Sequence, residues 1–244
     1  MIRVEGLSKK YGEFAAVRDL DFEVRPGSIL GLVGANGAGK TTTLRTLSGI
    51  VAPTTGSLSI AGHDIVNDSV RAKLSLGYIP DDPRLFDTLT VWEHLAFTAA
   101  AYRVAEFEAM AESLLQLFEL SAKRDTPAHS LSRGMRQKVA IACAYLHMPK
   151  ALLFDEPLTG LDPQGIQTIQ TSLREKARDG TAIVISSHLL SLVEELCTHV
   201  LVLDHGQCLW FGPIEQALQM SAGASDTTSL EEAFFRLTGR GAQE

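Results

Sequence analysis

The residues with the clearest chemistry lie in a glycine-rich stretch near the N-terminus. Residues 34–41 read GANGAGKT, which is the pattern G-x-x-x-x-G-K-T. Glycines in this pattern let the backbone turn tightly and point its N–H groups at an anion. Lys40 can reach the terminal phosphates of a nucleotide, and the hydroxyl of Thr41 can bind Mg²⁺. The stretch therefore predicts a phosphate-binding loop, rather than a glycine-rich turn that binds nothing.

The residues on either side of this loop support the same prediction. Residues 29–33 (ILGLV) have the pattern of a buried strand, and residues 42–47 have the pattern of a helix. The positive end of that helix would face the phosphates. The positions expected to contact the nucleotide here are Gly34, Asn36, Gly37, Ala38, Gly39, Lys40, Thr41 and Thr42.

A second candidate group is a pair of neighbouring carboxylates. Residues 151–156 (ALLFDE) form an apolar run that ends in Asp155 and Glu156. Asp155 could hold Mg²⁺ through water, and Glu156 could polarise a water for attack on a γ-phosphate. Alone, the pattern would more often be a strand that ends in solvated acids. In a chain that also has the phosphate loop, that alternative is disfavoured, and the pair predicts a site for Mg²⁺ and an attacking water beside the loop.

Three cations lie at the start of a predicted helix in residues 131–138 (LSRGMRQK), namely Arg133, Arg136 and Lys138. Cations are unfavourable at the N-terminal end of a helix dipole. An anion that approaches the same end would explain them. A solvated, charged turn explains them equally well, because long basic side chains usually point outward.

Strand and helix patterns alternate along most of the chain, which predicts an α/β fold with a mainly parallel core sheet. The expected central strands are 29–33, 76–79, 151–154, 182–186 and 199–203. Residues 2–7, 17–24 and 56–60 resemble half-buried antiparallel strands instead.

Helical patterns dominate residues 84–146, which predicts an inserted helical subdomain. Residues 90–93 (TVWE) read as a capping box. One helical face is expected to carry Phe107, Met110, Leu114, Leu117 and Phe118. We expect one domain over residues 1–220. Residues 221–229 would then be a flexible linker, and a short C-terminal helix capped by Ser229 would complete residues 221–244.

Composition narrows the function classes. The chain has 244 residues and a formal charge of −7, which argues against a general nucleic-acid binder. Cys143, Cys197 and Cys208 are too few and too scattered for a disulfide framework or a zinc site, and each is expected to be a small buried hydrophobe. We expect neither a signal peptide nor a membrane-spanning segment, so work at a membrane would require docking onto another chain.

Taken together, these motifs resemble the nucleotide-binding subunit of an ATP-binding cassette (ABC) transporter, in the family's order and over nearly the whole chain. Residues 131–135 (LSRGM) stand where the family has its LSGGQ signature, and residues 160–162 (GLD) match its D-loop. His188 matches the switch histidine, and Tyr11 stands where an aromatic residue stacks on adenine. Residues 230–238 resemble the C-termini of bacterial export-type cassettes, whose permease is a separate chain.

The resemblance implies a P-loop NTPase fold with an antiparallel β subdomain and an inserted α-helical subdomain. It implies that two cassettes, identical or different, enclose two ATP molecules. Ser132 and the N–H of Gly134 would bind the γ-phosphate of ATP on the partner, and Asp162 would reach across the dimer. Glu156 would be the general base, with His188 holding the γ-phosphate and water in line. The expected location is cytoplasmic, on the inner face of the cell membrane, bound to an integral-membrane permease.

Three residues, one in the loop at 78–83 and two in the signature, depart from the family pattern. Asp81, in residues 78–83 (YIPDDP), stands where the family usually has Gln. A carboxylate there could be a ligand of Mg²⁺, or Asp81 could be a turn residue beside two prolines. In the signature, Arg133 and Met135 replace Gly and Gln, and Arg133 could add a cation near the partner's nucleotide or point to solvent.

Other functions remain open at this point. A non-transport ABC ATPase acting on ribosomes, DNA or an assembly complex is the main alternative, although neither a second cassette nor a long coiled coil is evident. A simple kinase would leave residues 131–135, 160–162 and His188 unexplained. Apolar residues between Phe86 and Tyr102, including Trp92, could line a groove for the permease or belong to the core.

Overall fold

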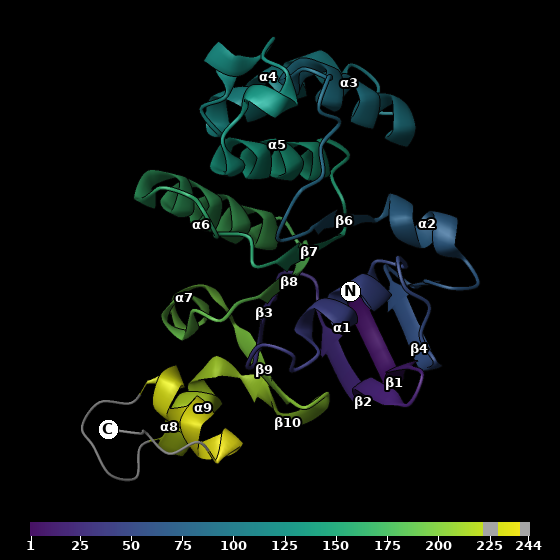
Figure 1. The fold of residues 1–244 in the computed structure, drawn as a ribbon, viewed down its shortest axis with the longest axis vertical. Coiled ribbons are helices and arrows are strands. Elements are labelled where there is room, and N and C mark those ends of the chain that lie inside the picture. The colour runs from purple at the N-terminus through teal and green to yellow at the C-terminus, as the bar shows by residue number, and fades with distance from the viewer. Residues whose placement is uncertain (222–228, 240–244) are drawn as a thin grey trace.

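The computed structural model of the protein describes residues 1–221 and 229–239, which form two sheets and their covering helices (Figure 1). One sheet has four strands in the order β2-β1-β4-β5, and the other has six in the order β10-β9-β3-β8-β7-β6. In Figure 1 the helical subdomain of α3, α4 and α5 lies at one end of the molecule, and α8 and α9 lie at the other. The α/β fold with a mainly parallel core sheet is confirmed.

The six-stranded sheet positions the phosphate loop. It contains β3 (Ile29–Val33), β6 (Leu76–Ile79), β7 (Ala151–Asp155), β8 (Ala182–Ser186), β9 (His199–Asp204) and β10 (Gln207–Pro213). Every residue of β3, β7 and β8 is buried, as expected for parallel strands that are covered on both faces. β3 pairs in parallel with β8 on one side and β9 on the other. All five predicted strands are confirmed, whereas β10, which is antiparallel to β9, was missed.

The second sheet packs against the helix that follows the phosphate loop. It contains β1 (Ile2–Tyr11), β2 (Phe14–Val24), β4 (Thr55–Ile60) and the short β5 (His63–Asp64). β1 and β2 extend beyond the predicted residues, so they form a tight hairpin in which Tyr11 pairs with Phe14. Its buried face packs with Leu44 and Leu47 in a core shared by both sheets.

The helical subdomain is inserted between β6 and β7, as predicted. It consists of α3 (Val91–Tyr102), α4 (Phe107–Leu117) and α5 (Arg133–Leu146). The predicted capping box is present, because Thr90 Oγ1 accepts from the Glu93 N–H at 3.1 Å and Glu93 Oε2 accepts from the Thr90 N–H at 2.8 Å. Leu117 is a correction: it lies at the edge of the apolar face of α4 and is 40% exposed.

The remaining helices cover the sheets. They are α1 (Lys40–Leu47), α2 (Ser69–Leu74), α6 (Pro163–Arg178), α7 (Leu190–Leu196), α8 (Ile214–Ser221) and α9 (Leu230–Thr238). As predicted, Ser229 caps α9, its Oγ accepting from the Glu232 N–H at 3.2 Å. α9 packs against α7 and α8, with Leu230 in the main core. Most of the predicted linker, residues 222–228, lies outside the described residues.

The cysteines follow the prediction only in part. Cys197 is buried and Cys143 is partly buried, whereas Cys208 is exposed on β10, an edge strand in which every residue is exposed or half-buried. Over residues 1–221 and 229–239, no helix combines the length and the apolar composition that crossing a bilayer requires.

Candidate nucleotide-binding site

The phosphate loop ends at an open helix N-terminus. Gly39 is the N-cap of α1 with a φ of 110°, and no side chain caps this end. Only glycine fits here, since φ lies in the left-handed region and a Cβ atom would stand 2.6 Å from the carbonyl oxygen of Ala16. The first N–H groups of a helix have no partner within it. These donors and the positive end of the α1 dipole therefore face an anion-binding pocket.

The β9–β10 turn holds the loop from behind. The N–H of Gly206 donates to the carbonyl oxygen of Ala38 at 2.9 Å, and the Gly206 carbonyl accepts from the N–H of Arg18 at 2.8 Å. Elements from both ends of the chain therefore fix the shape of the loop.

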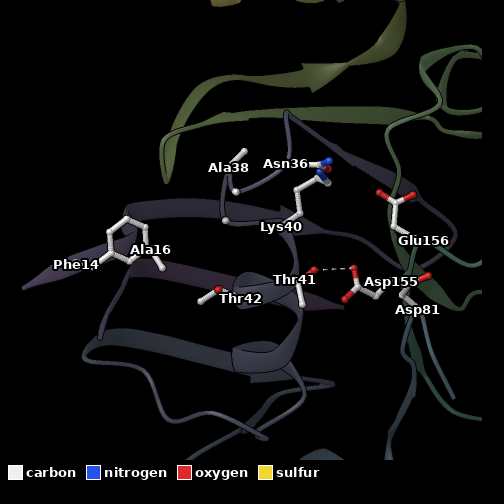
Figure 2. A pocket seen from close by; sticks show the side chains of 12 residues that line it. Phe14, Ala16, Asn36, Ala38, Lys40, Thr41, Thr42, Asp81, Asp155 and Glu156 are labelled. Atoms are coloured by element: carbon white, nitrogen blue, oxygen red, sulfur yellow. Dashed lines mark hydrogen bonds between the residues drawn. The ribbon is translucent and has the colours of Figure 1, made fainter. Parts of the chain in front are cut away.

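Lys40 lies under the loop rather than in solvent. It is buried, and its Nζ donates to the carbonyl oxygens of Gly34 at 2.8 Å and Ala35 at 3.3 Å. Burial lowers the pKa of the Lys40 ammonium, and the negative charges of Glu156 and Asp155 oppose that shift. Figure 2 shows this side chain reaching back along the loop toward Asn36.

Asp155 is held by two hydroxyl groups at the carboxyl end of β7. Its Oδ1 accepts from Thr41 Oγ1 at 3.2 Å (dashed in Figure 2) and from Ser186 Oγ at 2.6 Å. Asp155 and Ser186 are register partners of β7 and β8, and both are buried. The sequence did not indicate Ser186: it ends a predicted strand, but the pairing of that strand with the strand of Asp155 is a tertiary feature.

Glu156 follows Asp155 in a backbone conformation that a non-glycine residue seldom adopts, with φ at 48°. Its N–H contacts Ser186 Oγ at 3.1 Å and the Ser186 carbonyl oxygen at 3.2 Å, which holds this turn. Its Oε2 lies 2.8 Å from Nδ1 of His188. The structure thus brings the expected base and the expected switch histidine into direct contact.

These groups surround one pocket of about 360 Å³ (Figure 2). It is lined by Phe14, Ala16, Asn36, Gly37, Ala38, Gly39, Lys40, Thr41, Thr42, Asp81, Asp155 and Glu156. Gly34 contributes through its bond to Lys40 rather than as a lining residue.

The charges of this pocket fit a divalent cation bound together with phosphate. One lysine faces three carboxylates, those of Asp81, Asp155 and Glu156. Mg²⁺ is usually held by one or two carboxylates and by substrate phosphates. The described part of the chain holds no cluster of three or more His, Cys, Asp or Glu residues that could hold a metal ion. The Thr41 hydroxyl and Asp155 are oxygen donors of the type that Mg²⁺ prefers.

The aromatic end of the pocket differs from the prediction in detail. Phe14 is 65% exposed and lines the pocket at the end away from Glu156 (Figure 2). Tyr11, its partner across the hairpin, is 48% exposed, lies outside the lining, and has Lys9 Nζ 5.0 Å from its ring centre. Stacking of adenine on Tyr11 stays a prediction. Phe14 was missed because its place depends on where the hairpin turns.

The signature residues lie outside this pocket. Ser132 is the N-cap of α5, and its Oγ accepts from the Met135 N–H at 3.2 Å. Gly134 lies against the D-loop, where a Cβ atom would stand 2.8 Å from the carbonyl oxygen of Gly160. Asp162 caps α6, its Oδ1 accepting from the Gly165 N–H at 3.1 Å. Their predicted contact with nucleotide therefore requires a second cassette.

The three cations of the signature helix all have carboxylate partners in the same chain. Arg133 lies 2.9 Å from Asp81, Arg136 lies 3.8 Å from Asp87, and Lys138 lies 3.4 Å from Glu119. The sequence did not indicate these ion pairs, and an anion approaching this end of the helix from a second cassette stays a prediction. Asp81 lines the pocket as a Mg²⁺ ligand would, but its Oδ1 accepts from Arg133.

Comparison with known proteins identifies the family. Residues 17–159 match the family described as ABC transporter. The chain is 38% identical over 209 residues to Nod factor export ATP-binding protein I of Ralstonia nicotianae, covering 85% of this chain and 65% of that protein. It is 33% identical over 241 residues to ABC-type transporter ATP-binding protein EcsA of Bacillus subtilis, covering 98% and 96% of the two chains.

Solved structures show the same fold over almost the full length. A structure described as the ATP binding subunit of an ABC transporter superimposes with a TM-score of 0.92 at 32% identity, covering 98% of this chain and 99% of that one. cbiO1 from Clostridium perfringens, described as part of the ABC transporter complex cbiONQ, gives a TM-score of 0.77 at 28% identity, covering 89% and 90%. The chain therefore belongs to the ABC transporter family and carries its ATP-binding domain.

Proposed function

We propose that the protein binds and hydrolyses ATP in this pocket and thereby drives a transporter, most consistent with export, through a separate integral-membrane permease. The observation that carries the proposal is the meeting of Lys40, Asp155 and Glu156 in one pocket, with His188 on Glu156 at 2.8 Å. Export is supported by the name of the Nod factor relative. The acidic charge of −7 gives no support to a nucleic-acid partner.

Each residue has a defined task in the proposed reaction. Lys40 and the first N–H groups of α1 bind the phosphates. Thr41 and Asp155, with Asp81 as a further candidate, would hold Mg²⁺, which supplies positive charge beside the terminal phosphates. Phe14 or Tyr11 would support the adenine ring.

The carboxylate of Glu156 accepts a proton from water while the water oxygen bonds to the γ-phosphorus. The bond from that phosphorus to the bridging oxygen breaks, and its electron pair leaves with ADP. In the described arrangement Nδ1 of His188 contacts Glu156, so His188 would orient the base, besides the expected contact with the γ-phosphate.

A second cassette would complete the site. Ser132 and Asp162 are exposed and lie outside the pocket of their own protomer. Placed against another cassette, Ser132 and the N–H of Gly134 would contact the γ-phosphate from the other side. Hydrolysis would remove that contact, so the two cassettes would separate. Contacts to the γ-phosphate would thus order the interface between the cassettes, and their loss would disorder it.

A second cavity, of about 300 Å³, is the proposed docking groove for the permease. Phe86, Phe97 and Tyr102 line it, and the first two are largely exposed. Trp92 lies outside it, with its ring 5.5 Å from that of Phe107 and with Arg124 stacked on it at 3.7 Å. Of the two alternatives for Trp92, core packing is therefore the one supported.

The Glu156→Gln variant tests the hydrolysis proposal. It should bind ATP, form dimers in ATP by light scattering, and release phosphate about 10²- to 10⁴-fold more slowly, because the general base is lost. Glu215→Gln, the same change on the exposed start of α8, should leave turnover unchanged. Near-wild-type turnover of Glu156→Gln would exclude Glu156 as the base.

Co-purification tests the transport proposal. Membranes should retain the protein through a multi-span membrane protein encoded beside it, and deletion of that protein should release the cassette. Retention on ribosomes or DNA instead would support the non-transport alternative.

A further inference from the structure

Two of the three residues that depart from the family pattern, Asp81 and Arg133, contact each other. Arg133, in the signature, donates from Nη2 to Oδ1 of Asp81, in the loop after β6, at 2.9 Å. The two residues are 52 positions apart in the chain, and each side chain is 51% exposed. This contact links the helical subdomain to the loop that leaves the core sheet.

The outer part of the Arg133 stem passes close over the D-loop. It crosses Gly160 of the D-loop so closely that a Cβ atom at Gly160 would stand 3.2 Å from the Arg133 Cδ. Gly134 also lies against Gly160. The first turn of α5 therefore contacts both the D-loop and, through Arg133, the loop that contains Asp81. An arginine whose stem is packed loses less freedom when its guanidinium forms an ion pair.

The Asp81 side of this ion pair lies at the phosphate pocket. Asp81 is one of the three carboxylates that line it. Asp155 has the hydroxyls of Thr41 and Ser186, Glu156 has His188, and Asp81 has Arg133. An unpaired carboxylate at this rim would repel a triphosphate.

We propose that Asp81 and Arg133 are a positioning pair with two effects. Arg133 offsets the negative charge of Asp81 at the pocket, and the ion pair holds the first turn of α5, and with it Ser132, against the loop after β6. The proposal rests on the proposed function only in taking the ligand of the pocket to be ATP.

The two effects predict different responses to substitution. Arg133→Gln leaves a bare carboxylate at the rim, so the Kd for ATP without Mg²⁺ should rise about two- to fivefold at low ionic strength. Asp81→Asn leaves a bare cation, so the Kd should fall by a similar factor. The second effect, which holds the first turn of α5 and Ser132 in place, should be lost in both Arg133→Gln and Asp81→Asn.

Amide hydrogen exchange of Met135 reports the positioning without any nucleotide, because its N–H bonds to Ser132 Oγ. Exchange should become about 1.5- to 5-fold faster in either single variant, which is the range for an exposed ion pair. The double variant should be no faster than either single one. The exchanged pair, Asp81→Arg with Arg133→Asp, should restore slow exchange.

Arg136→Gln is the matched control, since it removes the same charge from the same helix turn but its partner, Asp87, is not a lining residue. It should change the ATP Kd less than 1.5-fold. Circular dichroism will verify folding, which half-exposed side chains should not disturb.

The proposal is overturned if Met135 exchange is unchanged in both single variants, if their effects multiply in the double variant, or if both shift the ATP Kd in the same direction. Failure of the wild-type protein to bind ATP would refute the proposed function instead. The exchange measurement would still decide the pair.

Discussion

Removing the hydroxyl of Ser186 should destabilise the protein more than removing that of its neighbour Ser187. Ser186 is fully buried, and its Oγ donates to Asp155 Oδ1 at 2.6 Å. Hydrogen bonds to charged groups contribute about 1.5–3 kcal/mol to stability. The Glu156 N–H would keep its contact with the Ser186 carbonyl oxygen at 3.2 Å, so the variant leaves no orphaned donor there.

We therefore expect Ser186→Ala to lower the free energy of unfolding by about 2 kcal/mol, or roughly 4–8 °C in Tm for a chain of this length. Ser187 is equally buried, but its Oγ accepts only a backbone N–H, that of Leu189 at 3.0 Å. Ser187→Ala should cost about 1 kcal/mol.

The contribution of the Asp155 charge to this hydrogen bond is measured by urea unfolding of the wild type, Ser186→Ala, Asp155→Asn and the double variant. In the background of Asp155→Asn, Ser186→Ala should cost only about 1 kcal/mol, because the acceptor is then neutral. Equal losses for Ser186→Ala and Ser187→Ala, or the same loss in both backgrounds, would refute the assignment of Ser186 as the support of the Asp155 carboxylate.

Three further predictions concern the pocket and the helical subdomain. Lys40→Ala should lower kcat/KM for ATP about 100-fold, as for other lost charge clamps, and an unchanged ATPase rate would refute the phosphate-loop assignment. Phe14→Ala should weaken ATP binding about tenfold and Tyr11→Ala less, with inorganic triphosphate unaffected, whereas the reverse order in a titration would assign the base to Tyr11. Burial lowers the pKa of His147 below 6.5, so the unfolded state binds the proton more readily and stability should fall as the pH drops from 6.5 through the folded-state pKa. His147→Phe should remove that contribution in urea unfolding at pH 7.5 and 5.5, while parallel curves for the two proteins would contradict the assignment.

The parallel strands and the phosphate loop could be predicted from the sequence because the residue patterns that indicate them are local. Strands buried on both faces are continuous apolar runs, and the loop lies between such a run and a helix. β10 lacks this signal, since most of its residues are exposed or half-buried. Leu117 was wrongly predicted to be buried, because it lies at the edge of the apolar face of α4. Whether such an edge is covered depends on the neighbouring elements.

The contacts that the sequence did not indicate in the candidate site share a different cause. Ser186 reaches Asp155 through the register of two strands, and Arg133 reaches Asp81 across 52 residues. Phe14 enters the pocket because the hairpin turns at residues 12–13. Such placements depend on tertiary pairing, which motif spacing along one chain does not contain.

The position of β3 in the sheet has a consequence for how the protein is made. β3 leads into the phosphate loop, but its neighbours β8 and β9 begin only at residues 182 and 199, and the turn behind the loop is at Gly206. Pairing over such sequence separations is slow and waits for late synthesis. A nascent chain that stops short of these residues displays the complete GANGAGKT motif without the framework that shapes it. We therefore expect nucleotide binding only after residues 182–206 have been synthesised and have paired with β3 and the loop.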